Sequence, residues 1–161
     1  MPEPLPVELM NTVRPDGDVL DDAWLLAVGA HRQDLAQLRE LRAALRRLAA
    51  DATDDPRCPT EVVSRPAALA TLNSLAGLAR SELAWPSDGP PLRTLHGPAV
   101  GVIATLGVEL LAGESRGRLR ACLAPNCVLY FVKEHTRREW CSPNCGNRAR
   151  VARHYQRHRQ D

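Results

Sequence analysis

The sequence is poor in aromatic side chains. Its 161 residues include one phenylalanine, two tyrosines and three tryptophans, although hydrophobic residues as a whole make up 44% of the chain. That share and that length are enough to bury a hydrophobic core. Such a core must consist mainly of leucine, alanine and valine, and because leucine and alanine favour helices, the composition predicts a mainly α fold.

Long apolar runs are also missing. No stretch approaches the roughly 18 apolar residues that a membrane-spanning helix needs. The first residues, Met1-Pro2-Glu3-Pro4, have neither the basic start nor the apolar centre of a secretory signal. We therefore expect no membrane partner and a cytoplasmic location.

The sequence lacks the motifs of common catalytic sites. It contains no glycine-rich phosphate loop, no Ser/His/Asp spacing of the kind found in hydrolases, and no pair of carboxylates close to a histidine. We therefore expect a protein without enzymatic activity.

Lysine is nearly absent, since Lys133 is the only one, and the arginines that carry the positive charge are unevenly distributed. Residues 1–115 contain ten arginines and sixteen acidic residues, a net charge of −6. Residues 116–161 contain eleven basic and three acidic residues, a net charge of +8. This asymmetry predicts two parts, 1–115 and 116–161, of which the second meets a polyanion.

Residues 1–115 show the periodicity of amphipathic helices. The clearest apolar stripe recurs at three- and four-residue steps and consists of Leu35, Leu38, Leu41, Leu45 and Leu48. The arginines of the same segment lie largely outside the stripe and are interleaved with acidic residues. We therefore expect a solvated face there, formed by Arg39, Arg42, Arg46 and Arg47.

Weaker signals complete a helical domain of about four helices. Residues 7–13 are apolar and either helical or extended, and a short helix ending at Gly29 has Asp18 or Asp21 as its cap. Further helices are expected over 66–78 and 99–111, and because the second is apolar nearly all round, it should lie at the centre of the core. Residues 83–85 and 92–96 are expected to pair as two short strands.

The C-terminal part predicts a small α+β unit. Residues 118–122 and 128–132 resemble two strands of a hairpin, and Ser142-Pro143 is typical of a helix start. The final helix should extend from about 143 to about 159. The expected fold class is therefore mainly α, with a helical N-terminal domain followed by a hairpin and a helix.

Four of the five cysteines form two close pairs, Cys122-x4-Cys127 and Cys141-x3-Cys145, with 13 residues between them. Four thiolates fill the tetrahedral shell that zinc prefers and leave no position for substrate. Two disulfides are the alternative, but they would require an oxidising compartment. We therefore predict one structural zinc ion. Cys58 stands apart from the pairs and is expected to be an unimportant thiol.

The segment RREWCSPNCGNRAR, residues 137–150, resembles the signature of the CGNR zinc-finger family. That family takes its name from the four letters that begin here at Cys145, and the upstream cysteine pair with Tyr130 and Phe131 fits it too. The N-terminal part is similar to the ABATE domain, described as a stress-induced transcription regulator. The residues that carry this second resemblance are Met10–Val13, Leu20, Trp24-Leu25, Leu38–Arg42 and Leu72-Asn73. Together they imply a bacterial DNA-binding regulator.

The last helix is the candidate nucleic-acid surface. At about 100° per residue, its arginines cluster on one face, while Val151, Ala152 and Tyr155 should pack on the zinc hairpin. A merely solvated basic face is the alternative. Asn147 and Arg148 follow the last cysteine, and they either contact nucleic acid or support the zinc site. The candidate contact residues are Asn147, Arg148, Arg150, Arg153 and Arg157.

The function expected from these features is zinc-dependent binding of duplex DNA in transcription regulation. The helical domain would respond to a small-molecule effector or bind a second subunit, or it would only add stability. Two alternatives remain open for the basic helix: docking on an acidic protein partner, and binding of RNA as an accessory factor.

Overall fold

The computed structural model describes residues 2–57 and 63–158, so Cys58 lies outside the described residues. Helices dominate this part of the chain, as the composition predicted. The α-helices are α1 (Leu5–Met10), α2 (Asp22–Ala27), α3 (Leu35–Ala52), α4 (Arg65–Ala76), α5 (Ala99–Ala112) and α6 (Pro143–His158). Short 3₁₀ turns precede α3 (η1, Arg32–Asp34) and follow α5 (η2, Glu114–Arg118).

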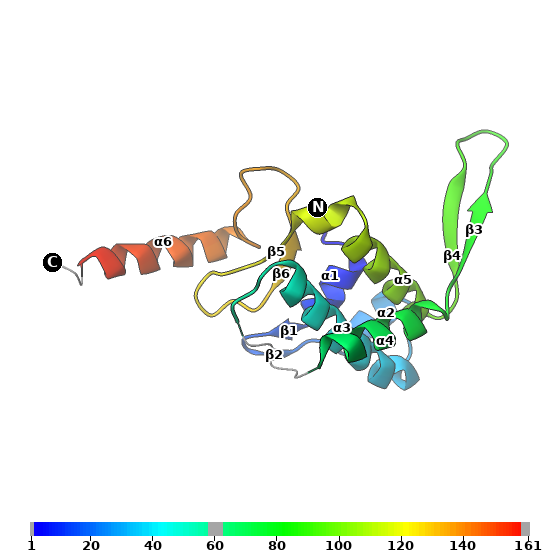
Figure 1. Ribbon diagram of the computed structural model, residues 1–161, viewed down its shortest axis with the longest axis horizontal. Coiled ribbons are helices and arrows are strands. Elements are labelled where there is room, and N and C mark those ends of the chain that lie inside the picture. The colour runs from blue at the N-terminus through cyan, green and yellow to red at the C-terminus, as the bar shows by residue number, and fades with distance from the viewer. Residues whose placement is uncertain (1, 58–62, 159–161) are drawn as a thin grey trace.

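Four helices form the main core. α4 packs between α3 and α5, and α1 lies against both α3 and α5 (Figure 1). Leu38, Leu41 and Leu45 of α3 are at most 1% exposed, and Ile103 of α5 is fully buried. The leucine stripe is therefore confirmed. α5 buries one face in the core, but α4, and not α5 as expected, is the helix that lies between two others.

Side-chain caps explain where two of the helices begin. The Asp21 carboxylate accepts a 2.9 Å hydrogen bond from the Trp24 amide and so caps α2. The Ser64 hydroxyl accepts from the Ala67 amide at 3.3 Å and caps α4. Of the two caps considered for α2, Asp21 is the one used, because Asp18 pairs with Arg42 instead.

The expected solvated face of α3 is wrong at two of its arginines. Arg42 is 5% exposed and Arg46 is 6% exposed. The Arg42 guanidinium donates to both carboxylate oxygens of Asp18 at 2.7 and 2.8 Å, and to the Thr12 hydroxyl at 2.8 Å. An arginine can lie along an apolar surface when oxygens at its end satisfy the guanidinium, so the helical periodicity alone misplaces both side chains.

Three two-stranded antiparallel sheets complete the described fold. The first is a minimal hairpin of β1 (Val13–Arg14) and β2 (Gly17–Asp18). The second joins β3 (Arg80–Ala84) to β4 (Leu92–His96), with Glu82 opposite Thr94, and projects from the helical body at one end of the molecule (Figure 1). This pairing was expected, although β3 begins earlier and ends before Trp85.

The third hairpin lies between the helical body and α6 (Figure 1). It consists of β5 (Leu119–Ala121) and β6 (Tyr130–Val132). Leu119, Tyr130 and Val132 are buried in the main core, whereas Phe131 points to the opposite side and packs with the cysteines. One hairpin therefore supplies side chains to two clusters at once, because successive side chains alternate between the faces of a strand.

The helix α6 extends away from the body (Figure 1). Only Cys145 and Ala149 are buried among its residues. Val151 is 53% exposed and Tyr155 is 67% exposed, so the expectation that they pack on the hairpin is wrong. Both side chains are exposed because α6 points away from the body: only its beginning contacts the cysteine cluster, and its later turns do not. Among the described residues, no helix is long and apolar enough to cross a membrane.

A pair of hydrogen bonds from Asn11 joins the helical body to the third hairpin. The Asn11 amide donates to the Tyr130 carbonyl at 2.8 Å, and its oxygen accepts from the Tyr130 amide at 2.9 Å. Asn11→Ala would leave both backbone groups without this partner. We expect the free energy of unfolding to fall by about 2 kcal/mol, measured by urea denaturation. Gln37→Ala, at an exposed position of α3, is the control and should change stability little; equal effects of the two substitutions would contradict the role of Asn11.

Candidate metal centre and nucleic-acid interface

The four paired cysteines converge on one point. The sulfur atoms of Cys122, Cys127, Cys141 and Cys145 all lie within 4.8 Å of one another. The Cys127 and Cys141 sulfurs are 3.7 Å apart, and those of Cys141 and Cys145 are 3.4 Å apart. Four sulfurs at about 2.3 Å from a tetrahedral zinc would be separated by about 3.8 Å, so the donor set and its spacing fit a zinc ion.

A tight backbone turn positions the first pair. Asn126 has a positive φ of 58°, a conformation that asparagine tolerates better than most residues. The Cys127 amide donates to the Ala124 carbonyl at 3.0 Å, and the Cys122 amide donates to the Leu129 carbonyl at 2.9 Å. These bonds bring both sulfurs to the same side of the turn between β5 and β6.

The start of α6 positions the second pair. Cys141 precedes the helix and Cys145 lies in its first turn, where the Ser142 hydroxyl accepts a 3.3 Å hydrogen bond from the Cys145 amide. The amides and the dipole of a helix N-terminus favour negative charge. The place of Cys145 in the helix therefore stabilises a thiolate there, as a bound metal ion would.

Glycine at position 146 leaves room for the neighbouring tryptophan. A Cβ atom at Gly146 would lie 3.1 Å from Cδ1 of the Trp140 side chain. Trp140 is partly buried and packs on the cysteine cluster. The second letter of the CGNR motif therefore lets the indole approach the first turn of α6.

Arg148 lies beside the metal site. Its guanidinium is 3.0 Å from the Cys145 sulfur, while the residue remains exposed. Burial would raise the pKa of the Cys145 thiol, but hydrogen bonds involving Ser142 and Arg148 outweigh it and hold the pKa below its usual value. The contact places the Arg148 guanidinium against a candidate metal ligand.

Arg138 holds the segment before the second pair. Its guanidinium donates to the carbonyls of Val132 at 3.2 Å and Cys141 at 3.1 Å, and it pairs with Glu3 at 2.5 Å. It also lies 4.9 Å from the centre of the Phe131 ring. The N-terminal residues are in this way tied directly to a metal ligand.

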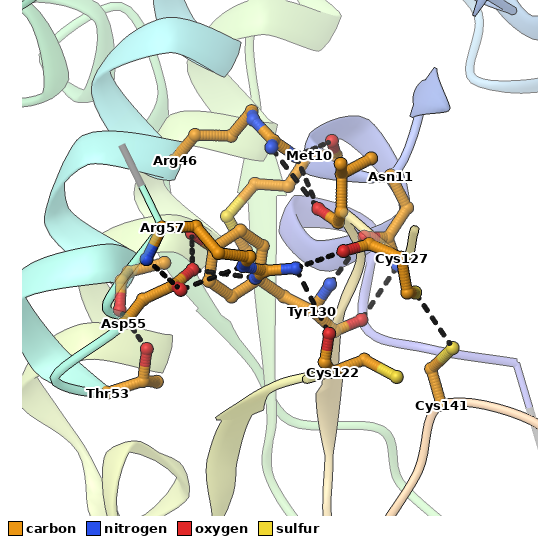
Figure 2. A network of polar contacts seen from close by, with 12 residues as sticks. Met10, Asn11, Arg46, Thr53, Asp55, Arg57, Cys122, Cys127, Tyr130 and Cys141 are labelled. Carbon is orange, nitrogen blue, oxygen red and sulfur yellow. Dashed lines mark hydrogen bonds and ion pairs between the residues drawn. The ribbon is translucent and has the colours of Figure 1, made fainter. Parts of the chain in front are cut away.

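Two arginines of the helical part reach the first cysteine pair from the other side (Figure 2). Arg57 donates to the carbonyls of Cys122, at 3.0 Å, and Cys127. Arg46 donates to the carbonyls of Met10 at 2.9 Å and Val128 at 3.2 Å. Sequence reasoning missed both residues, because a backbone carbonyl accepts hydrogen bonds whatever its side chain and leaves no signal in the sequence.

Asp55 and Tyr130 complete this network. The Asp55 carboxylate pairs with Arg57 at 2.6 Å and accepts a 2.9 Å hydrogen bond from the Tyr130 hydroxyl (Figure 2). Burial alone would raise the pKa of Asp55, but the hydrogen bonds from Arg57 and Tyr130 outweigh it, and the net pKa is lowered. Burial, together with the Asp55 charge, raises the pKa of Tyr130 to about 12, so its hydroxyl stays protonated and donates.

The candidate nucleic-acid residues follow the cysteines along α6. All of them are exposed, and the Asn147 side-chain oxygen accepts from the Arg150 guanidinium. Arg153 makes only a 3.4 Å contact with the Ala149 carbonyl, and Arg157 makes no hydrogen bond or ion pair with any residue that the structure describes. The structure thus brings Arg148 to the metal site and leaves Arg150, Arg153 and Arg157 on the projecting helix.

A surface groove adjoins these arginines. It has a volume of about 580 Å³ and lies between the loop 134–142 and the side of α6. Arg137 from the loop and Arg150 and Arg153 from the helix all line it, together with Glu134 and Glu139. Arg137 is exposed and adds a cation to those of α6.

The Asp55 network makes stability depend on pH. Because the pKa of Asp55 is lowered by folding, its stabilising contribution is full above the unfolded value of about 3.9 and is lost as the pH falls through the lower folded value. Asp55→Asn should reduce the free energy of unfolding at pH 7 by about 3 kcal/mol, since Arg57 loses its partner. The difference from the wild type should shrink as the pH falls from about 5 towards 3.

The matched control for this measurement is Asp22→Asn. Asp22 also pairs with an arginine, Arg32, but both side chains are more than half exposed. An exposed ion pair contributes little, so chemical denaturation across the pH range should show nearly wild-type behaviour. A pH-independent difference between Asp55→Asn and the wild type would contradict the assigned role of the carboxylate.

Comparison with known families gives two matches, in the order that the chain presents them. Residues 3–114 match the ABATE family, described as "Putative stress-induced transcription regulator". Residues 118–158 match the CGNR zinc finger, and this region contains all four clustered cysteines. A comparison with curated proteins gives no match. The ABATE match covers more than half of the sequence, and the chain therefore belongs to the ABATE family and carries a C-terminal CGNR zinc finger.

Proposed function

We propose that this protein regulates transcription by binding duplex DNA through α6, with one zinc ion holding the base of that helix. The observation that carries the proposal is the projection of α6 from the body, with only two of its residues buried (Figure 1). An α-helix of this kind has the size to enter the major groove of DNA. The net charge of +8 on residues 116–161 matches a polyanionic partner.

The distribution of cations on α6 supports contact with the phosphate backbone. Arg150, Arg153 and Arg157 have no acidic partner among the described residues, so their charge is available to a ligand. Arg137 adds a cation from the opposite wall of the groove. Together they form a path along which several phosphates can be neutralised, and such contacts give affinity and register rather than sequence specificity.

The proposed zinc ion has a structural role. Four cysteine sulfurs complete its tetrahedral shell, and a catalytic zinc needs an open position. Binding without catalysis is therefore the activity that the site supports. Thiols that hold zinc must stay reduced, which favours the cytoplasm as the compartment.

The proposed role of the helical domain is control of the finger. The hydrogen bonds from Asn11, Arg46 and Arg57 connect it directly to the backbone of the zinc site. A ligand or second subunit that binds two arrangements of this domain with different affinity would change the presentation of α6.

We expect one tightly bound zinc ion per chain, measured by elemental analysis of protein purified under reducing conditions. Cys141→Ser should abolish stoichiometric zinc and loosen the hairpin and the first turn of α6, because the energy of metal binding is folding energy for so small a site. Cys58→Ser changes the cysteine that belongs to neither close pair in the sequence, and this variant should retain the metal. Zinc-free wild-type protein, or two disulfides found by mass spectrometry, would contradict the proposal.

Replacing Arg150, Arg153 and Arg157 together with alanine should weaken binding to duplex DNA at least about tenfold. The slope of log K against log salt should fall by up to about 3, since each lost phosphate contact releases roughly 0.9 fewer counterions. Fluorescence anisotropy over a range of salt concentrations measures both quantities, and zinc content should be unchanged.

The control is a triple variant with the same loss of charge elsewhere, Arg14→Ala, Arg32→Ala and Arg39→Ala, at exposed positions of the N-terminal part. It should keep the wild-type salt slope. If both triple variants bind alike, α6 is not the contact surface. Stronger binding to single-stranded or duplex RNA than to DNA, or binding only to an acidic protein, would favour one of the two alternatives.

A further inference from the structure

The β3–β4 hairpin exposes large apolar side chains away from the rest of the protein. We refer to residues 80–96 as the arm. Leu83 is 70% exposed, Trp85 is 73% exposed and Leu92 is 52% exposed, and the arm projects beyond the ends of α4 and α5 (Figure 1). Leu92 pairs with Ala84 and therefore lies on the opposite face of the hairpin from Leu83. A lone two-stranded hairpin is only marginally stable in water, so an arm with exposed Leu83 and Trp85 is a candidate interaction site.

An apolar groove lies at the other end of the same helices. It has a volume of about 370 Å³ and is formed by α3, α4, α5 and η2. Its apolar lining includes Leu69, which is 44% exposed, together with Leu48, Leu72, Val108 and Leu111. The groove has room for an aromatic side chain, and its charged lining residues are Asp51, Arg65 and Arg116, of which Asp51 and Arg65 pair with each other at 2.7 Å.

The charges of the arm and the groove are complementary. Asp88 lies exposed in the turn at the tip of the arm and makes no hydrogen bond or ion pair with the residues that the structure describes. Arg116 lies exposed at the rim of the groove, and its guanidinium likewise has no partner in the described part of the chain. The arm thus carries an acidic residue, Asp88, three positions after the exposed Trp85, and the groove has Arg116, of opposite charge, beside its apolar lining.

The arm of one chain is badly placed to fill the groove of the same chain. The arm connects the end of α4 to the start of α5, whereas Arg65, Leu111 and Arg116 place the groove near the start of α4 and the end of α5. The 14 residues of α5 span about 21 Å, and the arm points away from the body (Figure 1). An arm that fills the groove must therefore come from a second molecule.

We propose that two copies of this chain form a closed dimer in which the arm of each copy docks in the groove of the other. If the α4–α5 pairs of the two copies lie antiparallel about a two-fold axis, each arm lies beside the partner's groove, and both contacts form together. Such an arrangement buries Leu83 and Trp85 and pairs Asp88 with Arg116. A two-fold interface of this kind closes on itself and leaves no free arm for further assembly.

Sedimentation velocity of the zinc-loaded full chain over a range of concentrations tests the dimer. The wild type should dimerise in the micromolar range. An arm variant, Leu83→Ser with Trp85→Ser, and a groove variant, Leu69→Glu, should each raise the dissociation constant at least about 30-fold, because buried aromatic anchors dominate such interfaces. Leu26→Ser is the matched control, since Leu26 is 81% exposed on α2 and belongs to neither surface.

A charge exchange tests the same contact with variants that leave the core untouched. Asp88→Arg and Arg116→Asp should each weaken the dimer, and the double variant should recover most of the lost affinity. A wild type that stays monomeric at the highest attainable concentration overturns the proposal. So does a groove variant that dimerises as tightly as the wild type while the arm variant does not, since the arms would then pack against another surface. DNA binding is measured separately, so neither result depends on the proposed function.

Discussion

The hairpin of β5 and β6 is the element on which the rest of the structure depends. Its strands place Tyr130 in the helical core and Phe131 among the cysteines, so neighbouring residues of one short strand contribute to both clusters. Asn11 pairs with both backbone groups of Tyr130, in the way that a neighbouring strand would. The zinc finger and the helical part are consequently packed as one structure, although two different families match them.

The arginines around the zinc site fit the charge that a four-cysteine site carries. A zinc ion with four thiolates has a formal charge of about −2, and a buried negative charge needs compensation. Arg148 contacts a sulfur directly, whereas Arg57 and Arg138 donate to backbone carbonyls of the ligand cysteines. Their cationic groups lie close to the site without replacing a ligand. A metal ion bound by the four thiolates would therefore be reinforced electrostatically by the packing of the helical domain.

Local patterns in the sequence predicted most of the elements but few of the contacts between them. The leucine stripe of α3, the cap of α2 and the two cysteine pairs are local signals, and each has its counterpart in the structure. The burial of Arg42 and Arg46 was missed because it depends on oxygens distant in the chain. The exposure of Tyr155 was missed because helical periodicity gives the faces of α6 but not its direction.

The direction of α6 is set at its base. Only Cys145 and Ala149 are buried, and the metal would hold Cys141 and Cys145 to the turn that carries Cys122 and Cys127. Arg57, just beyond the end of α3, donates to the carbonyls of both residues in that turn. If the segment that carries Arg57 shifts relative to the core, it must either move the turn or break these hydrogen bonds. Either change would alter the position of the cysteines and so of α6. Coupling between the two parts thus has a physical route that needs no change within α6 itself.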